Sequence, residues 1–221
     1  MKVMKNTLLV LFILLTSFAH AQRDYFNKFS LETSFGLNYP IAPTNFAEPI
    51  PVDPGVGEFA GPKHFDIGAR YMFSSLFGFK VSYGYDRFQY AGSDLATDFY
   101  RASFEAVFNT TDLFDIYYNR RRTMQIQLHG GVGLSAAISK TDTEIDSMGH
   151  LIFGVRPMFR LSDRFALTTD LSYLLNFKQD YGYSGVSFRD TLPDGFTGGY
   201  VNFSVGLNFY IGFRRDNGDF Y

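Results

Sequence analysis

One pattern constrains this chain more than any other: hydrophobic and polar residues alternate with a period of two in eight separate segments. In residues 200–213 (YVNFSVGLNFYIGF), every second residue from Val201 to Phe213 is hydrophobic, and the residues between them are small, polar or Tyr. Because successive side chains of a β-strand point to opposite faces, this pattern predicts a strand with one apolar and one polar face. The other seven segments lie at about 29–38, 64–73, 77–86, 99–108, 124–135, 150–160 and 165–174.

The connections between these segments differ in length. Residues 74–76 and 161–164 form tight turns. Longer, polar or Pro/Gly-rich loops are expected at 39–62, 88–98, 137–148 and 176–199, and the connection at 109–122 is also long. Short turns at one end and long loops at the other are typical of transmembrane β-barrels, in which the short turns face the periplasm.

Charge separates the two faces of the predicted strands. Asp, Glu, Lys and Arg occur only on the polar faces, which are also rich in Gly and Ser. Small residues suit the crowded interior of a narrow barrel, and a sheet in hydrocarbon must close because an open edge leaves backbone groups unpaired. We therefore predict an all-β, eight-stranded, antiparallel up-and-down transmembrane β-barrel. The alternative is a secreted soluble barrel or sandwich, in which the charged faces meet water.

The first residues have the features of a secretory signal peptide. Lys2 and Lys5 precede an apolar run at 8–15, and Ala19-His20-Ala21 is a small-x-small cleavage site. The apolar run is too short to span a bilayer comfortably. We expect cleavage after Ala21 and export of the mature chain. The sequence contains no Cys, which excludes disulfides and a lipid-modified N-terminal Cys.

Two segments carry a family resemblance, LHGGVGL at 128–134 and FRLSDRFAL at 159–167. With the eight alternating segments, they make residues 28–213 resemble the small eight-stranded outer-membrane barrels, the OmpA-like transmembrane domain family in the form common in Bacteroidetes. The resemblance implies the outer membrane of a Gram-negative bacterium. The expected domains are a signal peptide at 1–21, a barrel at 22–213 and a short C-terminal periplasmic tail at 214–221. Eight residues are too few for a peptidoglycan-binding domain, so wall anchoring is not expected.

The last strand also resembles the signal that the barrel-assembly machinery reads. That signal is a polar residue followed by x-Gly-x-x-aromatic-x-hydrophobic, and its positions fall on Ser204, Gly206, Phe209 and Ile211. The resemblance implies that this machinery is a partner during biogenesis.

Seven charged residues on the polar faces are the first candidates for a functional role. An eight-stranded barrel is just wide enough for side chains to fill its interior. We expect these residues to form an ion-pair network that plugs the lumen, and the alternative is a narrow gated pore for ions or small solutes. The residues are Glu32, Arg70, Lys80, Arg101, Glu105, Arg156 and Asp170.

An enzyme is the second alternative, in the form of a lipid- or peptide-modifying protein with an active site at the rim. His64 and His150 open two strands at the expected extracellular rim, and His129 lies within a third strand. Together with Asp66 and Asp86 they are candidates for a metal or acid–base site at the mouth. No close ligand spacing supports such a site. No nucleophile motif surrounds the loop serines, which are Ser93, Ser139, Ser184 and Ser187. We expect no catalytic residue, cofactor or metal.

Partners are expected to belong to the envelope. The formal net charge of −2 gives no reason to expect nucleic acid, and the apolar faces imply outer-membrane lipid as a neighbour. The loop at 39–62 holds six of the eight prolines, and the turn at 109–122 ends in Arg120-Arg121-Arg122. Either segment is a candidate surface for an envelope protein partner. The leading functional hypothesis is a non-catalytic structural or interaction component of the envelope, such as an accessory subunit of a larger complex.

Overall fold

The computed structural model describes residues 26–44, 63–89, 96–110, 123–140, 144–190, 192 and 194–220. The expected signal peptide, Ser93, most of the loop at 39–62 and most of the turn at 109–122 lie outside these residues. Within the described ranges, no helix has both the length and the hydropathy needed to cross a membrane.

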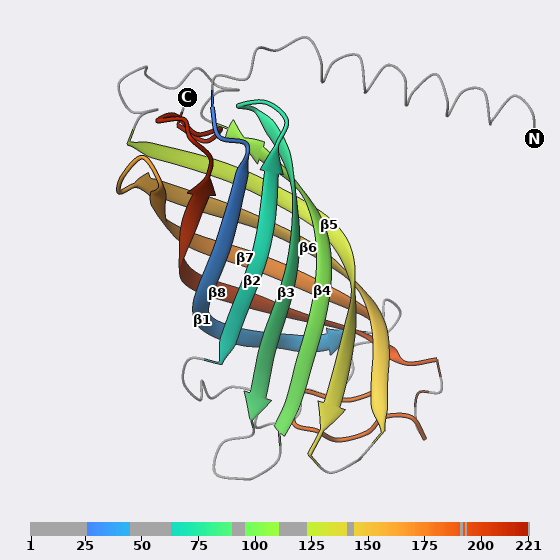
Figure 1. Cartoon of the computed structure of the whole chain (residues 1–221). Helices are drawn as coiled ribbons and strands as arrows, with labels where there is room; N and C mark the ends of the chain where they lie inside the picture. The colour runs from blue at the N-terminus through green and yellow to red at the C-terminus, as the bar shows by residue number, and fades with distance from the viewer. Residues whose placement is uncertain are drawn as a thin grey trace, which may run out of the picture.

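Eight β-strands form one closed antiparallel barrel, in which each strand pairs with its neighbours in sequence and β1 pairs with β8 (Figure 1). This confirms the predicted fold and strand order. The strands are β1 Phe29–Thr44, β2 His64–Met72, β3 Phe77–Gln89, β4 Ala96–Asn109, β5 Met124–Ser139, β6 Ile145–Arg160, β7 Phe165–Gln179 and β8 Phe196–Ile211.

The barrel has two distinct ends. The tight turns at 73–76 and 161–164 lie at the same end as the C-terminus, at the top of Figure 1, and we call this the turn end. The opposite end carries the last residues of β3 and β5, the first residues of β4 and β6, and residues 180–190, and we call it the loop end. The barrel closes where β8 pairs with β1, in a register that runs from Phe29 opposite Ile211 to Ile41 opposite Gly199.

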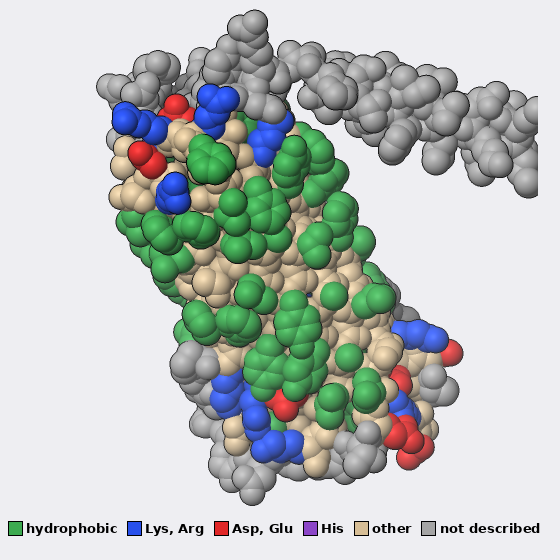
Figure 2. Space-filling model, viewed as in Figure 1, with side chains coloured by type: hydrophobic (Ala, Val, Ile, Leu, Met, Phe, Trp, Pro, Cys, Tyr) green, Lys and Arg blue, Asp and Glu red, His purple; other side chains and the backbone are tan. Residues whose placement is uncertain are grey.

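The two faces of the strands meet different surroundings. Outward-facing hydrophobic side chains such as Val81, Phe104 and Val132 are at least half exposed, whereas the inward-facing polar residues are buried. On the side seen in Figure 2, hydrophobic side chains cover the middle of the barrel, and charged side chains gather at its two ends. This distribution matches a hydrocarbon layer around the barrel wall.

Aromatic rings form a continuous patch on the outside of the turn end. Phe73 contacts Tyr71, Phe77 and Phe79, with ring centroids 5.1–6.0 Å apart. Phe77 extends the patch to Phe108 on β4 at 5.0 Å. Aromatic residues of this kind are enriched where a membrane protein crosses the interface between lipid and water.

The strands are longer at the loop end than the sequence pattern predicts. Loops were expected at 88–98 and 137–148, but β3 and β4 pair as far as Gln89 opposite Ala96, and β5 and β6 as far as Ile138 opposite Ile145. Three inward-facing residues of these extensions, Phe88, Ala137 and Met148, belong to a hydrophobic cluster inside the barrel mouth, whereas Thr97, Ser139 and Asp146 are buried and polar. The predicted boundaries were wrong because the apolar-out, polar-in alternation breaks down here, with Phe88 facing inward and the charged Arg87 and Asp98 facing outward. The cluster contains Phe88, Phe99, Ala137, Met148, Ile152, Leu174, Tyr183 and Tyr200.

Candidate functional site

All seven charged residues singled out from the sequence point into the barrel. None is more than 9% exposed. Asp66, Asp86, His64 and His129 lie among them and belong to the same network of contacts. These four share the inward parity of the seven residues, so the alternation itself could have added them to the predicted set.

Glu32 on β1 lies at the centre of the turn-side half of this network. Its carboxylate contacts the Nε of Arg70 at 2.5 Å, Nη1 of Arg156 at 2.9 Å and Nζ of Lys80 at 3.7 Å. Asn208 on β8 donates a further hydrogen bond to it at 3.1 Å. Since one carboxylate is shared by three cations from three strands, Glu32 ties β1 to β2, β3 and β6.

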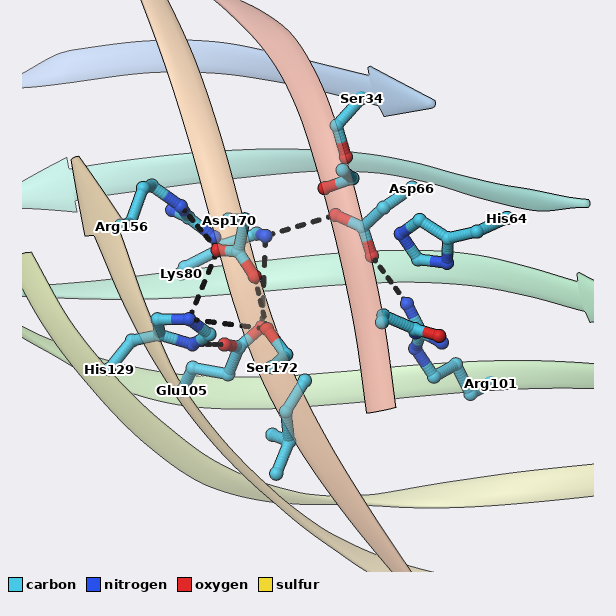
Figure 3. Close-up of a pocket in the computed structure, with 13 residues that line it drawn as sticks. Ser34, His64, Asp66, Lys80, Arg101, Glu105, His129, Arg156, Asp170 and Ser172 are labelled. Atoms are coloured by element: carbon cyan, nitrogen blue, oxygen red, sulfur yellow. Dashed lines mark hydrogen bonds and ion pairs between the residues drawn. The ribbon is translucent and has the colours of Figure 1, made fainter. Parts of the chain in front are cut away.

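Arg101 on β4 organises the half nearer the loop end. Its guanidinium forms ion pairs with Asp86 and with Asp66, the latter at 3.3 Å. Asp66 also accepts a hydrogen bond from Lys80 at 2.9 Å, which joins the two halves (Figure 3). The side chain of Arg101 lies across Gly84, where a Cβ atom would collide with the guanidinium. A side chain at that position would have to displace the guanidinium of Arg101 from its ion pairs.

His64 is part of this half. Its Nδ1 lies 2.7 Å from the carboxylate of Asp86, so the two rim residues considered for a metal or acid–base site do meet. Both candidate carboxylates are already paired with cations, Asp86 with Arg101 and Asp66 with Lys80 and Arg101. Among the described residues, no group of three or more His, Asp or Glu side chains is arranged to hold a metal ion.

His129 on β5 lies between two carboxylates. Its Nδ1 is 2.5 Å from Glu105, and its Nε2 is 3.1 Å from Asp170 (Figure 3). The hydroxyl of Ser172 lies 3.5 Å from the same Nε2, but it donates its hydrogen bond to Asp170. A serine, an imidazole and a carboxylate are the elements of nucleophilic catalysis. Here Asp170 binds both the imidazole and the hydroxyl, so Ser172 does not donate its hydrogen bond to His129.

His150 on β6 has a different set of partners. Its two ring nitrogens lie 2.9 Å from the hydroxyl of Ser103 and 2.7 Å from that of Ser135. This histidine is thus held between two serines of β4 and β5 inside the barrel. These two contacts fix the position of the imidazole ring, and neither of them involves a carboxylate.

The space left between the lumen side chains is small. One cavity of about 20 Å³ is lined by residues that include Asp66, His129 and Ser172, and another of about 10 Å³ lies beside Glu32. A cavity needs about 10–15 Å³ to hold one water molecule. The centre of the lumen therefore has room for a water molecule and not for a substrate beside Ser172.

Residues 212–220 close the turn end, a role that the sequence pattern did not reveal. Asp219 forms a bidentate ion pair with Arg70, with distances of 2.7 and 2.6 Å, and accepts hydrogen bonds from Gln127 and Tyr210. Phe220 packs in a buried cluster that includes Tyr210. Acidic and polar side chains are equally suited to a solvated tail. The composition of this segment therefore does not indicate whether it is buried in the barrel or exposed to water.

Asn27 fixes the path of this tail before it enters the barrel. Its side chain donates to the carbonyl of Arg214 at 2.7 Å and accepts from the amide of Arg214 at 3.0 Å. Its backbone bonds to Asp216 and Gly218. The residues just before β1 and just after β8 are thereby held together.

Residues 180–190 close the loop end. Tyr181 and Tyr183 are buried, and the hydroxyl of Tyr183 donates to the carbonyl of Gly199 at 2.8 Å. Burial raises the pKa of Tyr183 well above its usual range, so this hydroxyl stays neutral. Thr97 and Ser139 donate to carbonyls of the same segment, each at 2.8 Å.

The loop serines considered for catalysis include two in this region. Ser139 and Ser184 are buried. Ser139 is committed to the carbonyl of Gly185. Ser187 begins a turn in which its hydroxyl accepts from the amide of Arg189 at 3.4 Å.

The residues of the expected assembly signal lie on both faces of β8. Ser204 and Gly206 point inward, where Gly206 lies so close to the backbone of Thr33 that a side chain would collide with it. Phe209 and Ile211 point outward, and Phe209 contacts Phe165 with ring centroids 5.2 Å apart.

Comparison with solved structures finds outer-membrane proteins with the same architecture. The crystal structure of Neisserial surface protein A matches 83% of this chain and 97% of its own, with a TM-score of 0.52 and 11% identity. A major outer membrane protein from Thermus thermophilus matches 83% of this chain and 98% of its own, with a TM-score of 0.51 and 12% identity. The chain has the fold of the small eight-stranded outer-membrane β-barrels.

Sequence comparison adds nothing to this result, since no protein-family model and no curated protein sequence matches the chain. The likeness to solved barrels concerns the fold. Together with the apolar outer surface, the barrel fold supports the outer-membrane localisation expected from the sequence.

Proposed function

We propose that this protein is a non-catalytic β-barrel of the Gram-negative outer membrane, acting as a structural or interaction component of the envelope. The observation that carries the proposal is the filled lumen. Four buried cations, Arg70, Lys80, Arg101 and Arg156, pair with carboxylates from strands around the barrel, and residues 180–190 and 212–220 cover its two ends. Such an interior suits a rigid scaffold better than a transport path.

The same observation weighs against an enzyme. A rim active site needs a nucleophile and a base that a substrate can reach. Ser172 and His129 lie beside a cavity of about 20 Å³. His64 is bound to a carboxylate that is itself ion-paired with Arg101. In this arrangement, the loops and the lipid-facing surface are the parts of the protein that remain able to recognise a partner.

The orientation belongs to the proposal. With the turn end in the periplasm, the loop at 39–62 faces the cell exterior and the turn at 109–122 faces the periplasm. Each is then a surface for an envelope protein partner. Affinity purification from native outer membranes tests this role: a partner that is retained by the intact chain and lost when 45–62 is shortened to a brief Gly/Ser linker supports it. A chain that purifies without any stoichiometric envelope protein contradicts it.

Solute uptake separates the scaffold from the pore. Liposomes that contain the purified barrel are expected to swell in arabinose no faster than protein-free liposomes, while liposomes with a general porin swell rapidly. Swelling at a rate that rises with the amount of folded barrel would show that solutes pass through the lumen.

The last strand is proposed to serve also as the assembly signal. Replacing outward-facing Phe209 by Ala is expected to lower the amount of folded, heat-modifiable protein in the outer membrane. Phe203→Ala is the matched control, because Phe203 is an outward-facing residue of the same strand outside the signal positions. Equal losses in both variants would assign the effect to general packing.

A further inference from the structure

A groove of about 450 Å³ is cut into the lipid-facing surface of β4, β5 and β6, in the half of the barrel nearer the loop end. Small residues form its floor, among them Ala102, Ala136 and Gly149. Tyr100 pairs with Ala136 across the β4–β5 boundary, and Leu134 pairs with Gly149 across the β5–β6 boundary. Two large side chains thus stand beside small ones and form the walls.

The groove is open space in the isolated barrel. A Cβ atom placed on Gly149 would meet nothing within 4 Å, and Leu134 is 74% exposed. In a membrane, an unfilled groove of this kind would deprive the surrounding side chains of dispersion contacts. An acyl chain is the occupant whose chemistry suits a mostly apolar recess in the lipid-facing wall.

Basic side chains lie beyond the groove at the loop-end rim. Arg87 continues the outward face of β3, and Lys140 lies four residues beyond Ala136 on β5, about 13 Å along an extended strand. Lys63 lies beside Arg87, whose backbone amide bonds to its carbonyl. Figure 2 shows Lys and Arg side chains at this end, together with Asp and Glu side chains, next to hydrophobic side chains of the barrel wall.

Among the described residues, Asp98 is the acidic group in contact with this set of cations. Asp98 is bound by the hydroxyl of Tyr85 at 2.7 Å and by the Nε of Arg87 at 3.7 Å. The pKa of Lys63 is lowered by partial burial and by the charges of Arg87 and Lys140, while Asp98 acts in the opposite direction. The described part of this rim therefore places three cations, Lys63, Arg87 and Lys140, beside one carboxylate, and an anionic group would offset the excess positive charge.

We propose that the groove and the basic rim together bind one phosphorylated lipid, with an acyl chain in the groove and its phosphate at Lys63, Arg87 and Lys140. The inference rests on the proposed membrane location, which makes this the outer leaflet. Long Lys and Arg side chains reach along an apolar surface to place their charges at the level of lipid headgroups. The phosphate supplies the counter-charge, and the acyl chain fills the recess.

The test is lipid retention, measured by native mass spectrometry on the folded barrel in detergent with added phosphatidic acid or phosphatidylcholine. The wild type is expected to retain one phosphatidic acid in preference to phosphatidylcholine. Gly149→Leu fills the groove and should abolish retention. Gly130→Leu is the matched control, because Gly130 is an outward-facing glycine of β5 outside the groove where a Cβ meets only ordinary contacts.

The rim is tested by a charge-matched pair of double variants. Lys63→Gln with Lys140→Gln should weaken phosphatidic acid retention about tenfold or more, given the usual contribution of a basic residue near an anionic lipid. Lys178→Gln with Arg215→Gln removes two exposed cations elsewhere and should leave retention unchanged. A heat-modifiable gel shift verifies the fold of each variant, and if Gly149→Leu fails to fold, the rim variants decide.

Three results would overturn the proposal: retention of both lipids to the same extent, equal effects of Gly149→Leu and Gly130→Leu, or no retained lipid in the wild type. The last is expected if a protein partner covers the groove instead. None of these results bears on solute uptake, so a failure here is distinguishable from a failure of the proposed function.

Discussion

At the residue scale, the lumen shows how charges can be kept inside a narrow barrel. A buried charge is costly unless it is paired and hydrogen-bonded, and here each buried Arg or Lys of the lumen contacts at least two carboxylates. For stability, the sharing of one carboxylate by several cations matters more than the number of ion pairs. Because Glu32 and Asp66 each serve more than one cation, the loss of one group leaves several others with an incomplete set of partners.

The Arg70–Asp219 pair gives the sharpest test of this sharing. Asp219→Ala is expected to lower the free energy of unfolding by about 3–5 kcal/mol, since it leaves a buried guanidinium without its bidentate partner. Arg70→Met combined with Asp219→Leu should recover part of that loss, because both charges are then removed. Urea unfolding in phospholipid micelles measures both. A double variant no more stable than Asp219→Ala would mean that the damage is not electrostatic.

In the middle of the outer face of the barrel, a charged side chain is destabilising and apolar side chains are favoured. Val205 lies near the middle of β8 and is 44% exposed to the surroundings of the barrel. Val205→Lys is expected to cost about 2–4 kcal/mol in a bilayer, because the charge must enter hydrocarbon. Val205→Leu should change stability by no more than about 0.5 kcal/mol. Unfolding titrations in lipid vesicles compare them, and similar values for the two would place Val205 away from lipid.

At the element scale, alternation was enough to predict eight strands, their order and the closure of β8 on β1. It was not enough to predict where the strands end at the loop end. Phe88 and Met148 are inward-facing but apolar, and Arg87 is outward-facing but charged, so a rule that expects apolar residues outside and polar residues inside stops too early. Pairing in the lumen could not be predicted either, since which inward side chains meet depends on the register between strands that lie far apart in sequence.

The position of the C-terminal tail at the turn end can be tested directly. Gln127 lies beneath Asp219, to which its amide donates at 2.8 Å. The chain contains no Cys, so a single introduced thiol is a clean probe of access. Gln127→Cys is expected to resist a water-soluble maleimide in the intact chain and to react readily once 214–221 are removed.

The control for this experiment is Phe213→Cys, at an exposed position just outside β8. Its thiol should react at the same rate whether or not the tail is present. If Gln127→Cys reacts equally fast in both chains, the tail does not cover the turn end.

At the scale of the whole molecule, the barrel is closed by three separate devices. The charged network fills its middle, the tail covers the turn end, and the hydrophobic cluster with Tyr183 covers the loop end. The sequence indicated the first of these through the inward charges. It did not indicate the other two, because each depends on a segment outside the alternating pattern folding back into the barrel.

The ion conductance of single barrels in a planar bilayer tests the closed lumen most directly. Folded protein in concentrated KCl is expected to give no stable unitary currents, and removal of 214–221 alone should not produce them because the middle and the loop end stay filled. Stable unitary currents from the intact chain, scaling with salt concentration, would contradict a plugged barrel and establish a pore.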